Sequence, residues 1–177
     1  MPSAEGYRQG LFPAMTPPWL PAVGFTILPS VGSTIGQIGT DEQMKTWFVT
    51  LRKPRWTPPN WVFPPVWATL NTSAGYGSYL IWKELGGFTK DAVAPLGVYA
   101  TYLALNWSWS QVFFGAHKLK LAFFHSVLMT ACAAATVVVW CPFNRTAAYL
   151  MAPTVPWLVI ETVWSYRFWK DNLDKTK

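Results

Sequence analysis

The sequence predicts an all-α fold, a bundle of five transmembrane helices. Hydrophobic residues make up 51% of the chain and charged residues 12%, about half the charged share of an average soluble domain. The charges are also clustered, so that five long stretches are almost free of them. A soluble bundle of five buried helices is the alternative, but a chain of 177 residues supplies too little polar surface to cover that much apolar chain.

The predicted spans follow these stretches in order. Residues 9–40, 56–82, 92–116 and 121–144 carry no charge, and residues 146–166 carry only Glu161. Each is long enough for the roughly 20 residues that a helix needs to cross the bilayer core. We expect spans at 19–40, 60–82, 94–115, 121–141 and 147–168. The mean hydropathy of +0.18 understates this character, because the scale scores the abundant Trp, Tyr and Pro residues low.

The spans divide the chain into a flexible N-terminal tail (1–18), a membrane domain (19–170) and a basic C-terminal tail (171–177). The first 18 residues contain four prolines and one arginine, unlike a secretory signal with its basic start and apolar core. We expect Cys132 and Cys141, within and at the end of the fourth span, to be small apolar fillers and not redox groups. Two cysteines are also too few for a disulfide framework.

Lysine and arginine counts predict the orientation. With five spans, one side of the membrane receives four basic residues and the other side ten. Because cytoplasmic loops are enriched in Lys and Arg, we expect the 41–59 loop and the C-terminus in the cytosol. Contact with anionic membrane lipids accounts for the net charge of +6 without a nucleic acid partner.

Ten of the twelve tryptophans fall into two groups. Several lie near predicted span ends, as interfacial aromatic belts do: Trp19, Trp47, Trp61, Trp82, Trp140 and Trp169. Others lie deeper, and a belt does not explain them: Trp67, Trp107, Trp109 and Trp157.

Ordered motifs along the chain carry a family resemblance. They are the Trp19-Leu-Pro-Ala-Val-Gly start of the first span, the loop Lys53-Pro-Arg-Trp-Thr-Pro-Pro-Asn-Trp61, the segment Leu105-Asn-Trp-Ser-Trp109 and the end Tyr166-Arg-Phe-Trp-Lys-Asp-Asn172. Together they resemble the translocator protein family, the tryptophan-rich sensory proteins or peripheral-type benzodiazepine receptors. The resemblance covers residues 19–172, nearly the whole chain.

The resemblance implies a five-helix bundle with a ligand pocket at its cytosolic end, capped by the first loop. Family members bind cholesterol, porphyrins such as protoporphyrin IX or haem, and isoquinoline drugs, and animal members reside mainly in the mitochondrial outer membrane. Matching pocket positions here are Trp56, Pro58, Pro59, Trp67, Asn106, Trp109, Leu128, Trp157 and Glu161. Helix packing is the alternative role for these residues, and spacing alone favours it.

The fifth span ends with a sterol-recognition pattern formed by Val163, Tyr166 and Lys170. Spacings of three and four residues place all three on one helix stripe. The pattern alone is weak, and interfacial anchoring by an aromatic ring and a lysine is the alternative. Two residues depart from the family: Trp164 replaces a smaller aliphatic residue, and Arg167 replaces an aromatic one.

Glu161 stands where the family usually has a small residue. An ionisable group inside a membrane is costly and suggests a function. It is either protonated, paired with Arg167 or in contact with interfacial water. We expect it to weaken the binding of synthetic drugs. His125 is expected to form an interhelical hydrogen bond rather than to bind haem.

Small residues predict close helix contacts. Gly32 and Gly36 lie four residues apart in the first span, and Gly97, Thr101 and Ala104 form a stripe in the third. Because family members form dimers, some through the third helix, the resemblance implies a homodimer. Packing within one chain is an equally good alternative.

The expected function is binding of sterol and tetrapyrrole, with a role in their transport. A membrane-embedded enzyme, either isomerising sterol or degrading porphyrin, is the alternative. Such an enzyme would need acid–base groups deep in the bundle, and only His125 and Glu161 offer themselves. A channel or retinal-type photoreceptor ranks last, since no lysine lies in mid-span for a Schiff base. We expect no metal site and no bound cofactor.

Overall fold

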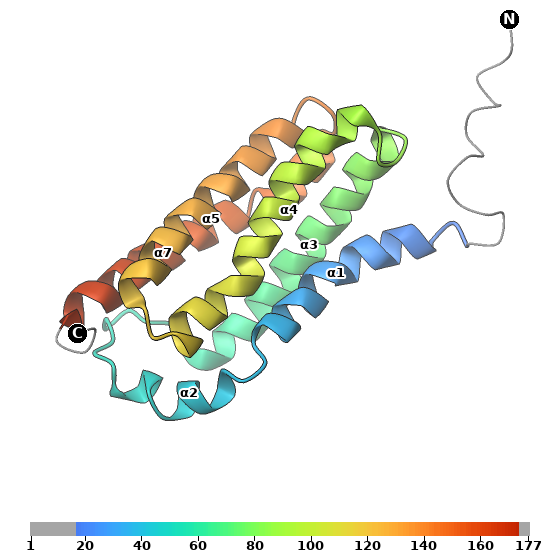
Figure 1. The fold of residues 1–177 in the computed structure, drawn as a ribbon. Helices are drawn as coiled ribbons and strands as arrows, with labels where there is room; N and C mark the ends of the chain where they lie inside the picture. The colour runs from blue at the N-terminus through green and yellow to red at the C-terminus, as the bar shows by residue number, and fades with distance from the viewer. Residues whose placement is uncertain (1–16, 174–177) are drawn as a thin grey trace, which may run out of the picture.

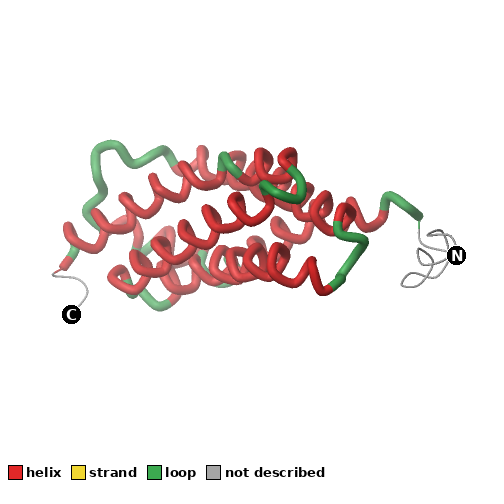
Figure 2. Tube along the Cα trace, turned by 90° about the horizontal axis from the view of Figure 1, so that it is seen from above, coloured by secondary structure: helices red, strands yellow, loops and turns green. Residues whose placement is uncertain are grey.

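The computed structural model describes residues 17–173 of the chain, and these contain helices but no strand. The α-helices are α1 (Leu20–Gly36), α2 (Asp41–Lys45), α3 (Phe63–Glu84), α4 (Lys90–Ser110), α5 (Leu119–Trp140), α6 (Arg145–Met151) and α7 (Thr154–Asp171). Figure 1 shows α3, α4, α5 and α7 side by side, with α1 crossing them at an angle and α2 lying at one end. The elongated outline is also clear from above (Figure 2). The all-α prediction is therefore confirmed for the described residues. The predicted N-terminal tail lies almost wholly outside them, as do residues 174–177 of the C-terminal tail.

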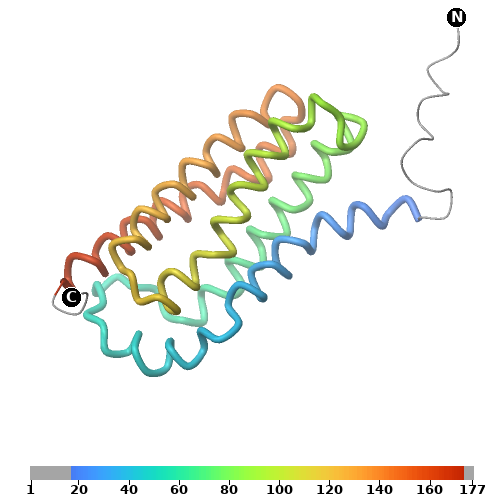
Figure 3. Tube along the Cα trace, viewed as in Figure 1, coloured from blue at the N-terminus to red at the C-terminus, as the bar shows by residue number. Residues whose placement is uncertain are grey.

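The connections gather at two ends of the bundle (Figure 3). The loop end contains residues 37–62, the turn at 116–118 and the end of α7. The turn end contains the connections at 85–89 and 141–144. The loops that the sequence assigned to the more basic side thus share the loop end.

Two predicted spans end differently in the structure. The first helix stops at Gly36 instead of residue 40, and the chain turns at Gly39 with φ of +82° before α2. The fifth predicted span, 147–168, is divided between α6 and α7 at Ala152–Pro153. Proline has no N–H and its ring crowds the preceding turn, so it interrupts the helix. Ser73 Oγ donates to the carbonyl of Leu150 at 2.7 Å, which satisfies one acceptor at the end of α6.

The last turn of α4 widens into a π-helical turn, Gln111–Gly115. Such a turn inserts an extra residue and changes which side chains face inward. As a result the consecutive residues Phe113 and Phe114 are both buried, with 0% and 9% of their surface exposed. This turn places two aromatic rings in the interior of the loop end.

Glycines bring α1 against α4. A Cβ on Gly32 would lie 2.1 Å from the Trp107 ring, and one on Gly36 would lie 2.1 Å from the Trp107 carbonyl oxygen. Trp107 Nε1 also donates to the carbonyl of Pro29 at 3.1 Å. Gly32 and Gly36 therefore serve helix packing within one chain, which was the alternative to a dimer contact. The predicted stripe of Gly97, Thr101 and Ala104 lies on an exposed face of α4.

The prediction that Trp140 belongs to an interfacial belt is wrong. Trp140 is completely buried, and its Nε1 donates to the carbonyl of Pro95 at 3.0 Å. Trp19 and Trp61 are 59% and 73% exposed, as residues of an interfacial belt would be. Position near a span end therefore does not separate belt tryptophans from core tryptophans.

The outer surface is strongly apolar. By length and composition, α5 is the one described helix that is apolar enough to cross a membrane, and α1 is apolar but shorter, with 17 residues. Large apolar side chains are exposed on several helices: Val23, Ile27, Val31 and Ile35 on α1, Leu121, Phe124 and Val138 on α5, and Val159, Ile160 and Val163 on α7. Apolar patches of this extent mark contact with a membrane or a partner.

The glycine packing gives a direct test of the α1–α4 contact. We expect Gly36→Ala to destabilise the protein by about 1–3 kcal/mol, because overpacking against rigid backbone forces the helices apart. Gly24→Ala is the matched control in the same helix, since a Cβ there meets nothing within 4 Å. It should be neutral or stabilising by up to about 1 kcal/mol, because alanine favours helix. Thermal unfolding of both variants in nanodiscs measures the difference, and equal midpoints would contradict this packing.

Candidate ligand-binding site

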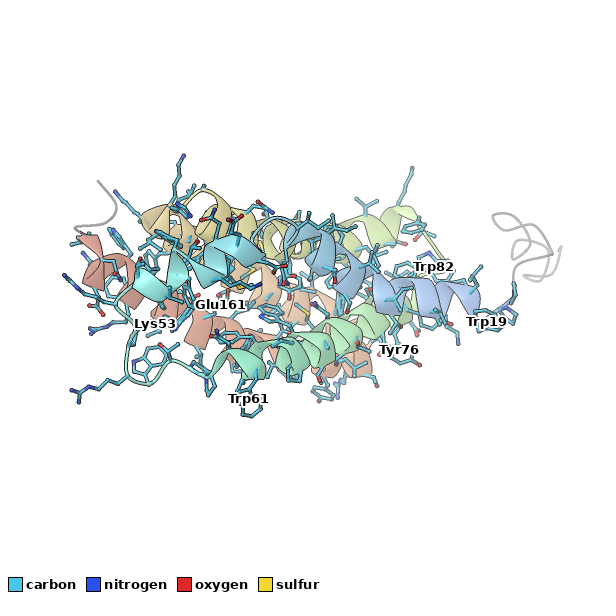
Figure 4. The ribbon with its side chains drawn as sticks, turned by 90° about the horizontal axis from the view of Figure 1, so that it is seen from below. Trp19, Lys53, Trp61, Tyr76, Trp82 and Glu161 are labelled. Atoms are coloured by element: carbon cyan, nitrogen blue, oxygen red, sulfur yellow. The ribbon has the colours of Figure 1, made fainter. Side chains whose placement is uncertain are left out.

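Four predicted site residues point into the bundle from three helices. Trp67 of α3 and Trp109 of α4 are half-buried and pack on the same core cluster. Trp157 and Glu161 follow one another by one turn on α7, and Glu161 is 7% exposed. Figure 4 shows Glu161 among the helices, nearer to Lys53 at the loop end than to Trp82 at the turn end. The structure thus turns these four residues toward the interior, and ring contacts connect two of them, Trp109 and Trp157, through Phe113, Trp164 and Phe63.

Ring contacts connect Trp109 and Trp157 into a continuous aromatic wall. Trp109 stacks on Phe113 with ring centroids 4.9 Å apart, and Phe113 stacks on Trp164 at 5.7 Å. Phe63 then contacts Trp164 and Trp157, each at 5.9 Å. Flat aromatic walls of this kind suit flat apolar ligands.

Two polar groups in this apolar region lack hydrogen-bond partners. The indole Nε1 of Trp157 is buried and unpartnered within the described chain. The Glu161 carboxylate makes no hydrogen bond or ion pair that the described residues provide. Of the three alternatives for Glu161, the ion pair with Arg167 is wrong, because Arg167 pairs with Asp171 at 3.3 Å on the exposed side of α7. Buried polar groups usually have partners, so this donor and this acceptor are the groups available to a ligand.

Hydroxyl side chains of α5 and α7 form a series of contacts next to Trp109. Trp109 Nε1 donates to Ser126 Oγ at 2.8 Å, and Ser126 contacts Ser165 of α7 at 3.3 Å. One turn further, Thr130 and Thr162 are in contact at 3.0 Å. Polar contacts of this kind join helices inside membranes, and they hold the Trp109 ring in one orientation.

The remaining predicted pocket residues are placed elsewhere. Trp56 is 47% exposed on the loop, and Leu128 is 53% exposed on the outer face of α5. Pro58 is half-buried and Pro59 exposed. Asn106 Oδ1 accepts a hydrogen bond from Ser33 of α1 at 3.0 Å, which is the packing role considered as the alternative.

The loop is attached to α7 by residues that the sequence reasoning did not select. Asn172 is completely buried, and its side chain accepts from the Arg52 N–H at 2.8 Å and donates to the Arg52 carbonyl at 3.1 Å. Trp164 Nε1 donates to Thr57 Oγ1 at 3.2 Å. Asn172 is the last residue of one of the motifs that carry the family resemblance, and this was the one sequence feature that could have pointed to it. A buried amide that pairs with a loop backbone is not visible in sequence spacing.

Aromatic side chains fill the interior between this loop and the site. Phe48 from the loop contacts Phe113, Trp164 and Phe168, with centroids 5.6–6.1 Å apart. Phe48 and Phe168 are 5% and 0% exposed. A cavity of about 690 Å³ lies instead between α1 and α4. Phe48 and Phe168 therefore fill the space between the loop and the aromatic wall.

The sterol-pattern residues share one exposed stripe of α7. Val163 and Tyr166 are 49% and 40% exposed, and Lys170 Nζ lies 5.8 Å from the Tyr166 ring and 4.5 Å from the Trp169 ring. Trp164 faces the opposite way, into the aromatic wall. Its departure from the family residue thus affects the interior site and not the stripe.

His125 forms an interhelical hydrogen bond. Its Nε2 lies 2.8 Å from the carbonyl oxygen of Leu105 on α4, so that nitrogen donates. Ser108 Oγ lies 3.5 Å from the same nitrogen. No contact between His125 and Glu161 is present among the described residues, so the two acid–base candidates do not form a pair.

The amino-acid sequence is similar to those of known proteins. Residues 25–170 match the TspO/MBR family. The chain is 49% identical to the translocator protein of sheep and 48% identical to that of human, each over 158 residues that cover 89% of this chain and 94% of the relative. Human translocator protein 2 is 34% identical over 150 residues, which cover 84% of this chain and 88% of the relative. All three are named as translocators and not as enzymes.

The attachment of the loop can be tested with Asn172→Ala. The variant removes both hydrogen bonds between the Asn172 side chain and the Arg52 backbone, each worth about 0.5–1.5 kcal/mol. We expect faster trypsin cleavage after Arg52 and Arg55 in nanodiscs. Asp171→Ala is the control, because it removes only an exposed ion pair worth about 0–1 kcal/mol. Equal cleavage rates in the two variants would contradict a role for Asn172 in holding the loop.

Proposed function

The chain belongs to the TspO/MBR family, and on this basis we propose a five-span membrane protein that binds sterols and porphyrins and assists or regulates their transport. The observation that carries the proposal is the run of ring contacts from Trp109 through Phe113, Trp164 and Phe63 to Trp157. Trp157 adds a buried donor without a partner among the described residues, and Glu161 follows it by one turn of α7.

Helix lengths support five spans. Helices α3 and α5 have 22 residues each and α4 has 21, and 22 residues at 1.5 Å per residue give about 33 Å. The bilayer core measures about 30 Å. Helix α1 and the pair α6–α7 supply the first and fifth spans. Trp, Tyr and Pro lower the hydropathy of the helices other than α5 without making them polar.

The distribution of basic residues supports an orientation with the loop end in the cytosol. Lys45, Arg52, Lys53, Arg55, Lys118, Lys120, Arg167 and Lys170 belong to this end, whereas Lys83, Lys90 and Arg145 belong to the turn end. The positive-inside preference then places the C-terminus in the cytosol. Together with the family resemblance, this favours the mitochondrial outer membrane.

The chemistry of the interior site suits a flat, largely apolar molecule with a few polar groups. A porphyrin or an isoquinoline carboxamide can stack on the indole rings, while the Trp157 N–H donates to an acceptor on its edge. Entry requires Phe48 and the loop to move, since they close the site. The loop thus acts as a lid, and Thr57 and Asn172 hold it shut.

Cholesterol is proposed to bind at the exposed stripe of Val163, Tyr166 and Lys170. The ring of Tyr166 offers a flat apolar face, and Lys170 lies above it. The stripe faces outward, so a sterol reaches it from the bilayer without opening the lid.

A homodimer is proposed through the exposed stripe of Gly97, Thr101 and Ala104 on α4. Small residues permit close approach between helices in membranes. Gly32 and Gly36 are excluded from this interface because Trp107 of the same chain covers them.

Porphyrin binding can be measured by quenching of tryptophan fluorescence in nanodiscs. We expect saturable quenching by protoporphyrin IX that an isoquinoline carboxamide reverses. Trp157→Phe keeps the aromatic ring but removes the N–H, so its affinity should fall about 2–10-fold, the value of one hydrogen bond. Trp61→Phe should bind as the wild type does, because Trp61 is 73% exposed. Non-saturable quenching, or equal affinity in the Trp157→Phe protein, would count against this site.

Glu161 should oppose the binding of neutral drugs, because an apolar ligand surface against its carboxylate gives that polar group no hydrogen-bond partner. We expect Glu161→Ala to bind an isoquinoline carboxamide about tenfold more tightly, which corresponds to about 1.4 kcal/mol. Glu161→Gln preserves the volume and separates the effect of charge from that of size. Equal radioligand affinity in the wild type and the Glu161→Ala variant would refute this role.

A further inference from the structure

Glu161 is a buried carboxylate that has no counter-charge among the described residues. Its side chain is 7% exposed, and none of the described groups donates a hydrogen bond to it or forms an ion pair with it. Two basic side chains at the loop end have other partners: Arg167 pairs with Asp171, and Lys53 Nζ lies 4.1 Å from the centroid of the Phe48 ring. A buried charge without a counter-charge is costly. The carboxylate therefore offers a site to a cation from outside the chain.

Two tryptophans flank Glu161 on the same side of α7. Trp157 lies four residues before it and Trp164 three residues after it, spacings that place all three side chains on one helix face. Both indole rings contact Phe63 at the start of α3, with ring centroids 5.9 Å apart in each case. Because Phe63 bridges the turns before and after Glu161, three aromatic rings lie around the carboxylate.

Helix α4 supplies the facing wall. Tyr102 is 1% exposed and lies close enough to Glu161 for the two side chains to interact electrostatically. Trp109 lies seven residues further along the same face of α4, and its ring contacts that of Trp164 with centroids 6.5 Å apart. The face of α4 that carries Tyr102 and Trp109 is therefore turned toward the face of α7 that carries Glu161 and Trp164.

Aromatic rings around a carboxylate are the chemistry that recognises an organic cation. The face of an aromatic ring attracts a cation, most strongly when the ring is Trp and water is excluded. A carboxylate that accepts a hydrogen bond from an N⁺–H group also forms a bond about twice as strong as a neutral one. A neutral molecule gains neither contribution, and an inorganic cation does not use the aromatic surface. The two features together therefore select a cation on an aromatic framework.

The Trp157 N–H adds a second point of recognition. It is buried without a partner among the described residues, and four residues of α7 separate it from Glu161. This separation is about 6 Å along the helix axis at 1.5 Å per residue. A ligand that meets both groups carries a cationic nitrogen and, roughly one helical turn away, a hydrogen-bond acceptor.

We propose that the interior site binds an organic cation, an aromatic molecule whose ammonium group lies on Glu161. The ammonium N–H donates to the carboxylate, the rings of Trp157, Trp164 and Phe63 lie around it, and an acceptor on the ligand receives the Trp157 N–H. The inference rests on the proposed function, because it adds a ligand class to the same interior site. Glu161 is then the residue that sets the charge preference of this site.

Two ligands of the same shape that differ in charge test the proposal. Both are isoquinoline carboxamides, one with a dimethylamino group at the end of its amide substituent and the other with an isopropyl group in that place. The full-length protein is held in nanodiscs of zwitterionic phosphatidylcholine, which limits adsorption of the cation to lipid. We expect the wild type to bind the protonated amine at least about tenfold more tightly than the isopropyl compound in radioligand binding.

Variants of the two carboxylates of α7 assign the preference to one residue. Glu161→Gln keeps the volume and removes the charge, and Glu161→Ala removes both, so the preference for the amine should disappear in each variant. Asp171→Asn is the matched control, because it removes a carboxylate that already pairs with Arg167, and it should keep the full preference. Saturable quenching by protoporphyrin IX in each variant shows that the variant is folded.

Three results would overturn the proposal. Equal affinity of the wild type for the two ligands would indicate that Glu161 holds a proton and not a cation. A preference that persists in both Glu161 variants would place the ammonium group elsewhere, and one that is lost in Asp171→Asn would make it an effect of surface charge. Saturable porphyrin quenching alongside any of these results would leave the proposed function standing, whereas non-saturable binding of the porphyrin and of both ligands would remove the two together.

Discussion

The indole N–H of buried tryptophan is the group on which this bundle depends. A buried Trp contributes a large apolar ring and one donor that requires a partner. Trp107 donates to Pro29 on α1, Trp109 to Ser126 on α5, Trp140 to Pro95 on α4 and Trp164 to Thr57 in the loop. Each bond joins two segments that are distant in sequence. In a membrane, where helices gain little from hydrophobic contact with one another, such bonds and close packing provide the specificity.

Trp157 departs from this rule, and that departure locates the candidate site. Its Nε1 is buried without a partner in the described chain, one turn from Glu161, which is 7% exposed. Ser126 of α5 and Ser165 of α7 are in contact with each other. Other buried side-chain groups, such as Tyr99 OH and Thr154 Oγ1, also have no partner among the described residues. The Trp157 donor differs from them in its place beside Phe63, whose ring joins it to Trp164, and this place in the aromatic site suggests binding.

Glycine has two different roles in this fold. At Gly36 and Gly75 the missing side chain lets another helix approach, since a Cβ would meet backbone oxygen at 2.1 and 2.6 Å. At Gly24 and Gly97 the missing side chain leaves open space. The first role brings α1 against α4 and α3, and the second leaves space between α1 and α4 near the turn end. The same residue type therefore determines where the helices touch and where they stay apart.

The sequence by itself determined the helical class, the approximate positions of the long helices and the grouping of their connections at two ends. It could do so because long charge-free stretches and clustered basic residues are local features. It also indicated that deep tryptophans matter, and three of them line the site.

Only the tertiary structure decided which side chains face inward. Trp56 and Leu128 are exposed, Arg167 pairs with Asp171 and not with Glu161, and Trp140 is core. The break at Pro153 and the π-helical turn at Gln111–Gly115 shift the faces of α7 and α4, and helical spacing read from the chain assumes regular turns. Partners such as Asn172 and Arg52 are 120 residues apart, so their pairing depends on how the helices pack and not on any pattern within either segment.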